Sequence, residues 1–471
     1  MAIKKKSKNV YEIEKEGNMN VPGIVFASER LFEEIRKDKT IEQVKNVAML
    51  PGIVGKSIAM PDAHLGYGFS VGGVAAFDIK RGIVSPGGIG FDVNCGVRLL
   101  RTELKKEQFL KKRDRVLDSL FRNVPSGTGK GSRFQVSKEE LQEILDNGVK
   151  WALRKGYATK DDIEHTEDNG CIKGADCSKV SERAIARGKE QLGSIGSGNH
   201  FLEVQFVEKI YDSEAGEVFG LSEGQIVVLV HTGSRGLGHQ VASDYLLKIE
   251  KEIGTKGLPD RQLACAPIES QIGRDYLSAM AAAANFAFVN RQLITHQVRK
   301  IFNEFFQGVE IRVVYDVAHN IAKIEEFEVD GENINLLVHR KGATRSFGPG
   351  RKELPNDYRK IGQPILIPGS MGTASYVLVG TNEARNISFA STAHGAGRMW
   401  SRTKAKNELN VTDVKKELER AGVVIKSGSI KGIVEEAPEA YKDVDEVVRV
   451  SDELGLGKKV ARLKPIAVMK G

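Results

Sequence analysis

The chain has 471 residues, of which 41% are hydrophobic and 28% charged; these values are typical of globular proteins and exclude a disordered or fibrous chain. Seventy Lys and Arg against 62 Asp and Glu give a net charge of +8, which fits a polyanionic partner without requiring one. The four cysteines form no CxxC pair and no apolar stretch approaches a membrane helix, so we expect a cytoplasmic protein without a zinc ribbon, disulfide scaffold or membrane span.

The N-terminal part is predicted to combine helices with glycine-rich loops. The segment up to about Asn46 is charged and partly amphipathic, which favours a surface helix. Residues 60–95 suggest loops with short apolar runs, because nine glycines lie between Gly66 and Gly96. The next elements expected are a strand at Val97–Arg101, a helix at Lys105–Phe121 and a polar helical lobe around 130–176.

The C-terminal part is predicted to alternate strands with glycine turns. One long alanine-rich helix, or two in succession, is expected at Ser270–Phe306. Apolar runs predict strands at Phe201–Val207, Ile226–Val230, Ile311–Ala318, Leu336–Val338, Ile365–Ile367 and Tyr376–Val379, with helices at Val411–Ala421 and Val444–Arg449. Because no Pro/Ser linker divides the chain, we expect one large α+β unit spanning 1–471, with mixed and antiparallel sheets flanked by helices.

Five histidines adjoin strand-like runs in turns flanked by small residues: His200, His231, His319, His339 and His394. The segment Gly90–Gly96 adds Asp92 and Cys95, a carboxylate and a thiol bracketed by glycines. A buried structural cysteine is the alternative for this segment alone. With His200, His231 and His319, however, these two residues supply the N, O and S ligands of a one- or two-metal site. The thiolate favours Zn²⁺, Fe²⁺ or Co²⁺, and Mn²⁺ also fits a mixed site.

The other histidines and the basic residues leave several alternatives open. His165 and His296 are expected to be structural or solvated, whereas His64 and His239 could support the metal ligands, contact RNA or be structural. The loops Gly193–His200 and Thr232–Gly238 could form anion nests. Basic residues recur in or near the histidine turns and favour a phosphorylated ligand: Arg235, Arg340, Lys341, Arg345, Arg351, Arg398 and Arg402.

Across nearly the whole chain, these motifs closely resemble those of the RtcB family of RNA-splicing ligases. The resemblance rests on Met60–Phe69, Gly90–Gly96, Gly196–Phe201, His231–Gly238, Asp316–Asn320, His339–Gly350, Pro368–Gly372 and Ala393–Arg398. Ser70 stands where this family commonly has proline, a departure that touches none of the expected metal ligands.

The resemblance implies an RtcB-like fold and GTP- and Mn²⁺-dependent joining of RNA 3′-phosphate or 2′,3′-cyclic phosphate ends to 5′-hydroxyl ends, in tRNA splicing or RNA repair. Cys95 would bridge two Mn²⁺ ions, for which Zn²⁺ or Co²⁺ could substitute. His231 and His319 would complete one site, and Asp92 and His200 the other. His394 would attack the α-phosphate of GTP to give a guanylated histidine and then an RNA 3′-pp-5′ guanosine end.

The resemblance also implies contacts for the nucleotide and for RNA. The nucleotide contacts would be Asn199, Phe201, Glu203, Asn320, Ser370, Gly395, Ala396, Gly397, Tyr441 and Lys470. The RNA-phosphate contacts would be Arg235, Lys341, Arg398 and Arg402. Broken or intron-excised tRNA halves are the expected substrates, and the need for an archease-type activator stays open.

Two other classes of protein compete with an RNA ligase. A metal-dependent phosphoesterase or nuclease acting on RNA ends would need the same metals and basic loops but no nucleotide. A non-catalytic RNA-binding protein would need only the basic surface, and it leaves the cluster of Asp92, Cys95 and histidines unexplained.

Overall fold

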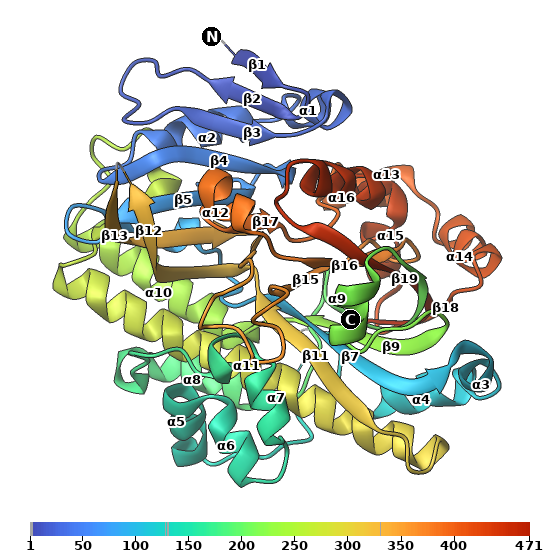
Figure 1. The fold of residues 1–471 in the computed structure, drawn as a ribbon. Helices are drawn as coiled ribbons and strands as arrows, with labels where there is room; N and C mark the ends of the chain where they lie inside the picture. Colours follow the sequence, from blue (N-terminus) through green and yellow to red (C-terminus); the bar gives the residue numbers. More distant parts are fainter. Residues whose placement is uncertain (1–2, 128, 130, 330) are drawn as a thin grey trace.

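The computed structural model describes residues 3–127, 129, 131–329 and 331–471, and its centre consists of two large sheets with helices around them (Figure 1). The first sheet has the order β1 (Ile3–Ser7), β2 (Val10–Ile13), β3 (Gly23–Phe26), β4 (Ile53–His64), β5 (Val71–Asp78), β13 (Glu332–Lys341), β12 (Asn320–Val329). The second has the order β11 (Ile311–Ala318), β7 (Gly96–Lys105), β9 (Gln225–Thr232), β8 (Phe201–Ile210), β19 (Lys458–Lys470), β16 (Ser375–Val379), β15 (Pro364–Ile367), and β18 (Val424–Ser427) pairs with β19.

Both sheets are mostly antiparallel, but β3 pairs in parallel with β4, and β18 with β19. Two short ladders join β6 (Ile83–Val84) to β10 (Ala266–Pro267) and β14 (Ala343–Arg345) to β17 (Ser391–Ala393). The helices are α1 (Glu29–Ile35), α2 (Thr40–Ala48), α3 (Lys106–Leu110), α4 (Arg113–Asn123), α5 (Lys138–Asn147), α6 (Val149–Arg154), α7 (Lys160–Glu164), α8 (Glu182–Lys189), α9 (Ser213–Val218), α10 (Arg235–Glu252), α11 (Gln271–Phe305), α12 (Asn382–Ser388), α13 (Arg402–Glu408), α14 (Val411–Arg420), α15 (Ile430–Glu435) and α16 (Val444–Glu453). The predicted α+β class with mixed sheets is confirmed.

The second sheet is covered on both faces, which explains the unbroken apolar run of β9. Because side chains alternate along a strand, Val228 and Val230 pack into one core, which also contains Val298 of α11. Val227 and Leu229 pack into a separate core on the opposite face. Apolar residues at successive positions of β9 are therefore expected, because both faces of this strand are buried.

The long helix α11 is a single element of 35 residues, which confirms the first of the two alternatives expected for this segment. Ser270 caps it by accepting a hydrogen bond from the Gly273 amide. The buried alanines between Ala279 and Ala284 allow close packing against α5 and α10. At 1.5 Å per residue the helix is about 50 Å long, and in Figure 1 it crosses the lower half of the molecule, with α5 and α6 below it.

The expected strands from Val97 onward and the expected C-terminal helices are confirmed, whereas three predictions nearer the N-terminus are only partly correct. The first 46 residues contain β1, β2 and β3 as well as helices. The expected loops at 60–95 include β5 and the end of β4. The expected helix at Lys105–Phe121 is divided into α3 and α4 at Lys111 and Lys112. Short strands with many charges or glycines give weak sequence patterns, and pairing with neighbouring strands determines their conformation.

The segment expected as a helical lobe contains α5, α6 and α7. Leu141 and Leu145 of α5 pack into the same core as Ala283 of α11. Lys130, the first residue of the expected lobe, lies outside the described residues. Whether the lobe is a separate unit, and whether 1–471 is one domain, stay predictions. In the part of the chain that the structure describes, no helix has both the length and the apolar character needed to cross a bilayer.

Candidate metal centre and nucleotide pocket

Four neighbouring strands of the second sheet bring the predicted metal ligands to one end. Cys95 immediately precedes β7, and His231 is the penultimate residue of β9. His200 immediately precedes β8, and His319 follows β11. The register pairs Val97 with His231 and Phe201 with His231. Residues far apart in the sequence therefore become neighbours because their strands are adjacent.

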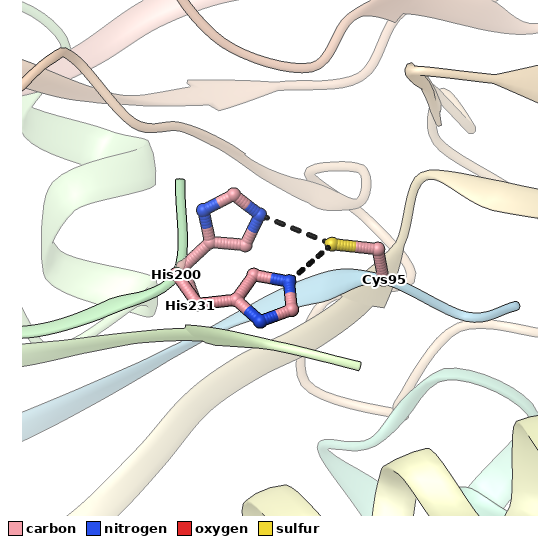
Figure 2. A group of neighbouring side chains, drawn as sticks. All are labelled: Cys95, His200 and His231. Carbon is pink, nitrogen blue, oxygen red and sulfur yellow. Dashed lines mark hydrogen bonds between the residues drawn. The ribbon is translucent and has the colours of Figure 1, made fainter. Parts of the chain in front are cut away.

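The cluster is compact and its donor atoms face one another. Cys95 Sγ lies 3.3 Å from His200 Nε2 and 3.3 Å from His231 Nε2 (Figure 2). His231 Nε2 lies 3.3 Å from His319 Nε2. Asp92 Oδ2 lies 2.9 Å from His200 Nε2. The structure thus brings together all five residues expected as metal ligands: Asp92, Cys95, His200, His231 and His319.

The chemistry of this cluster fits a bound cation. Burial lowers the pKa of His231 and of His319 well below the ordinary histidine value, which keeps both imidazoles in the neutral form that binds metals. Burial also raises the pKa of the Cys95 thiol, so a cation would have to displace its proton. One sulfur, three imidazole nitrogens and one carboxylate match the ligands that proteins use for transition metals.

A buried arginine holds the segments that carry these ligands. Arg291 of α11 donates to the backbone oxygens of Asn94 and Thr232, at 2.9 and 2.8 Å. It also pairs with the buried carboxylate of Asp316, as does Arg98. Asn94 and Thr232 are next to Cys95 and His231 in the chain. One fully buried guanidinium therefore fixes two ligand-bearing segments relative to each other.

His394 follows β17 and is held by a carboxylate that the sequence analysis did not single out. Asp62, in β4, accepts from His394 Nδ1 at 2.6 Å and from the His394 amide at 3.0 Å. Burial acts to raise the pKa of Asp62, but His394 outweighs it and holds this pKa below the ordinary value. An ionised Asp62 can only accept hydrogen bonds, so Nδ1 carries a proton, and in the neutral form of this imidazole the lone pair is on Nε2. The imidazole of His394 lies beside that of His319, with 4.9 Å between ring centroids.

One cavity of about 350 Å³ connects the cluster, His394 and most of the expected nucleotide contacts. Its volume is within the range of small-molecule sites. Of the expected nucleotide contacts, Asn199, Phe201, Asn320, Ser370, Gly395, Ala396, Gly397, Tyr441 and Lys470 line it, as do Lys341, Arg398 and Arg402 of the expected RNA contacts. Their roles stay predictions, but the structure places them around one space.

Glu203 and Arg235 are outside this lining. Glu203 is buried in β8 and accepts from Gln205 Nε2 at 2.7 Å, and burial raises the pKa of Glu203 to about 7. Arg235 is buried at the start of α10 and donates to the Gly127 carbonyl at 2.6 Å. In this conformation neither side chain lines the space that a ligand would fill.

Glu436 is a cavity residue that the sequence analysis missed. Its carboxylate is fully buried and accepts a hydrogen bond from the Tyr441 hydroxyl. It lies 3.2 Å from the Arg398 guanidinium and 3.8 Å from Lys470 Nζ. One acid thus balances several of the cations that line the cavity. Glu436 stands at the end of the short helix α15, in a segment without a histidine or a recognised motif, so nothing in the local sequence indicated its position.

The remaining histidines have separate environments. His339 is buried and accepts from the Ser85 amide at 3.2 Å, which is a structural role. His165 is bonded to Asp357 at 3.0 Å, and His296 packs edge-on against Tyr157. His239 stacks on Phe91, while His64 lines the cavity, and burial lowers the pKa of His64 to about 4.

Most of the other basic residues near the histidine turns have partners in the protein. Arg340 pairs with Glu325, Arg345 with Glu167, and Arg351 with Glu353. Lys341 differs because it lines the cavity. Its Nζ donates to the carbonyls of Tyr67 and Phe69, at 2.6 and 2.9 Å, and burial lowers the pKa of Lys341 to about 7.

The α+β fold and the buried sulfur, imidazole and carboxylate cluster beside a carboxylate-held histidine define a candidate metal-dependent enzyme. The family model described as "tRNA-splicing ligase RtcB" matches residues 43–471, and the chain belongs to this family. Proteins named tRNA-splicing ligase RtcB from Thermococcus kodakarensis and Nanoarchaeum equitans are each 52% identical to it, over 100% of this chain and 99% of theirs. One from Aeropyrum pernix is 52% identical over 96% of both chains.

Proposed function

We propose that this protein is a GTP-dependent RNA ligase of tRNA splicing and RNA repair, which joins RNA 3′-phosphate or 2′,3′-cyclic phosphate ends to 5′-hydroxyl ends. The observation that carries the proposal is the position of His394. This histidine has its Nδ1 bonded to Asp62 and lines the same cavity as Cys95 and His231. Membership of the RtcB family supports the RNA-ligase class.

The chemistry of His394 follows from its hydrogen bond. With the proton on Nδ1, the Nε2 lone pair would attack the α-phosphate of GTP, forming a P–N bond while pyrophosphate leaves. The imidazolium formed in this step would be stabilised by Asp62. An RNA 3′-phosphate would then take the GMP from His394, giving an RNA 3′-pp-5′ guanosine end. Attack by the 5′-hydroxyl on the 3′-phosphorus would form the phosphodiester and release GMP.

The metal ligands would be Asp92, Cys95, His200, His231 and His319, and we propose two Mn²⁺ ions as their cations. When bound, the cations would neutralise negative charge on the phosphates. The other charges at the cavity belong to the chain. Arg398 and Lys470 face Glu436 at 3.2 and 3.8 Å, and we infer that a nucleotide would compete with this acid for both cations.

The proposal is tested by incubating the protein with α-labelled GTP and Mn²⁺. We expect a labelled protein adduct that is acid-labile and base-stable, as a phosphorus–nitrogen bond to histidine requires. The alternative, a metal-dependent phosphoesterase or nuclease, predicts no adduct and hydrolysis of RNA ends in the absence of nucleotide. Joining of 3′-phosphate ends without any nucleotide would also contradict the proposed mechanism.

Lys470 gives a second test of the nucleotide pocket. It lies near the end of the chain, its side chain is 3% exposed, and its Nζ is 5.7 Å from the centroid of the Phe201 ring. Deleting Lys470 and Gly471 is expected to raise the KM for GTP by about ten-fold or more, because a charge-assisted contact is lost. Bound metal should change less. The measurement is the rate of guanylation at a series of GTP concentrations.

Because the deletion also shortens β19, Lys470→Met is the control that retains the strand. It should reproduce most of the loss if the ammonium group contacts the nucleotide. Deletion of Gly471 alone should leave guanylation close to wild type. Unchanged guanylation kinetics in both Lys470 variants would exclude a role for this residue in the pocket.

A further inference from the structure

Large apolar side chains are exposed beside the cavity, between two arginines that line it. Met399 is 45% exposed, and Trp400 is partly exposed. Arg398 precedes them and Arg402 follows, and both arginines line the cavity. An apolar pair at the edge of a cavity that would hold the end of an RNA needs an explanation, because most tryptophan surface is buried in folded proteins.

The backbone holds this pair in place. The amides of Met399 and Trp400 both donate to the Ala440 carbonyl, at 2.8 and 3.1 Å. The Trp400 carbonyl accepts from Arg398 Nε at 3.2 Å. The backbone of Trp400 is therefore fixed relative to a cavity-lining arginine and to the segment that leads to Tyr441. Only the side-chain torsions of the indole would still have to be ordered when a ligand stacks on it.

Cations surround the indole. Lys404 Nζ lies 4.6 Å from the centroid of the Trp400 ring, and Ser401 caps α13, which carries Lys404. The Arg402 side chain is 53% exposed, and its Nε lies 3.6 Å from a carboxylate oxygen of Glu435 and 3.6 Å from one of Glu436. Lys406, farther along α13, is paired with Glu435 at 2.6 Å. Arg402 and Lys404 are thus the two exposed cations that follow Trp400 within four residues, whereas Arg398, two residues before it, is partly buried.

We propose that Met399, Trp400, Arg402 and Lys404 form a stacking platform for single-stranded RNA next to the end that is joined. An aromatic ring with adjacent cations is the combination that binds single strands, because every base has a face that can stack and every nucleotide carries a phosphate. Continuity with the cavity through Arg398 and Arg402 favours RNA over a protein partner. This inference deepens the proposed function and rests on it.

Changes to the platform should distinguish the binding of RNA from the binding of the nucleotide. Trp400 is outside the cavity lining, whereas the expected nucleotide contacts, apart from Glu203, line it. Loss of the indole should therefore affect steps that involve RNA and leave guanylation by GTP unchanged. A base stacked on Trp400 would be read by its face alone, so the platform should accept all four bases with little preference.

The chain offers a direct optical test, because it has two tryptophans. Trp151 lies in α6 and is 2% exposed, so Trp151→Phe leaves Trp400 as the only indole. Titrating this variant with a short single-stranded RNA that carries a 3′-phosphate should quench its fluorescence, more weakly as salt rises. Trp400→Phe, which keeps Trp151, should show no quenching.

The kinetic test uses RNA already capped as 3′-pp-5′ guanosine. Trp400→Ala should raise the KM for this RNA roughly ten-fold, and Trp400→Phe should restore most of the affinity. The matched control is Tyr211→Ala. Tyr211 is 40% exposed and has Lys209 and Lys459 over its ring, but it follows the end of β8 that is remote from the cavity. Its replacement should leave the KM for RNA unchanged.

Unchanged fluorescence on RNA addition, or an unchanged KM for RNA in Trp400→Ala, would overturn the platform and leave a protein partner as its occupant. Equal losses in Trp400→Ala and Tyr211→Ala would also overturn it, because the effect would not be specific to this site. A failure of the proposed function can be distinguished from a failure of the platform. A wild-type protein that quenches normally with RNA but forms no GMP adduct would retain the platform and exclude the guanylation mechanism.

Discussion

Replacing His394 with alanine is expected to abolish the GMP adduct and the joining of RNA 3′-phosphate ends. The loss should be on the order of 10⁴-fold or more, as for other catalytic nucleophiles. The physical reason is that alanine has no ring nitrogen to attack the α-phosphate, whereas the His394 ring is oriented for this attack by the bond between its Nδ1 and the Asp62 carboxylate. The measurements are adduct formation with labelled GTP and gel analysis of ligation.

The same variant should still seal RNA supplied with a 3′-pp-5′ guanosine end, since the final attack by the 5′-hydroxyl does not need the nucleophile. It should also keep its metal, because Cys95 and the other ligands remain. Sealing of the capped RNA shows that the fold and the RNA site are intact. An adduct on the His394→Ala protein, or a His394→Ala protein that joins uncapped ends, would show that another residue is the nucleophile.

The Cys95→Ala variant is expected to lose bound metal and ligation while the fold persists. Cys95 Sγ is 3.3 Å from both His200 Nε2 and His231 Nε2, so removing it takes away the atom that lies between two other ligands. Metal content is measured by elemental analysis of the purified protein, and folding by circular dichroism. Ligation should fall to the level of the metal-free wild type.

Cys265→Ala is the matched control, because Cys265 is also a buried free cysteine but packs in the hydrophobic core with Ala264 and Ala266. It should retain both metal and activity. If Cys95→Ala keeps its metal and its ligation, the thiolate is not a ligand. If the two variants lose activity equally, the loss at Cys95 reflects packing instead of metal binding.

The metal cluster could be predicted because its signal is local. His200, His231 and His319 each adjoin an apolar run in a turn of small residues, and short apolar runs bounded by such turns are consistent with buried strands. The order β11, β7, β9, β8 that brings them together was not predictable from these runs, since the pairings of β11 with β7 and of β7 with β9 join strands more than a hundred residues apart. The sequence thus selected residues that the structure brings together, without indicating how the order of the strands brings them there.

The sequence analysis did not single out residues whose roles depend on contacts with groups far away in the sequence. Asp62 lies in a motif that was noticed, but its role depends on His394, which is 332 positions away. Glu436 and Arg291 are likewise defined by the groups they touch. Arg235 is a different case, because its place in a glycine loop suggested a phosphate contact, which stays a prediction, whereas in this structure its side chain is buried and donates to the Gly127 carbonyl. Charge near a motif predicts a site only when the fold leaves the charge accessible.

The place of β19 in the second sheet has a consequence for how the protein is made. This strand is the last element of the described chain to be synthesised, yet it lies between β8 and β16 inside the sheet. Its register places Lys470 opposite Phe201 in the cavity. All five proposed metal ligands and His394 leave the ribosome before it. A nascent or prematurely terminated chain can therefore contain the proposed metal ligands and the proposed nucleophile without Lys470, so we expect guanylation and ligation only after synthesis has passed this residue.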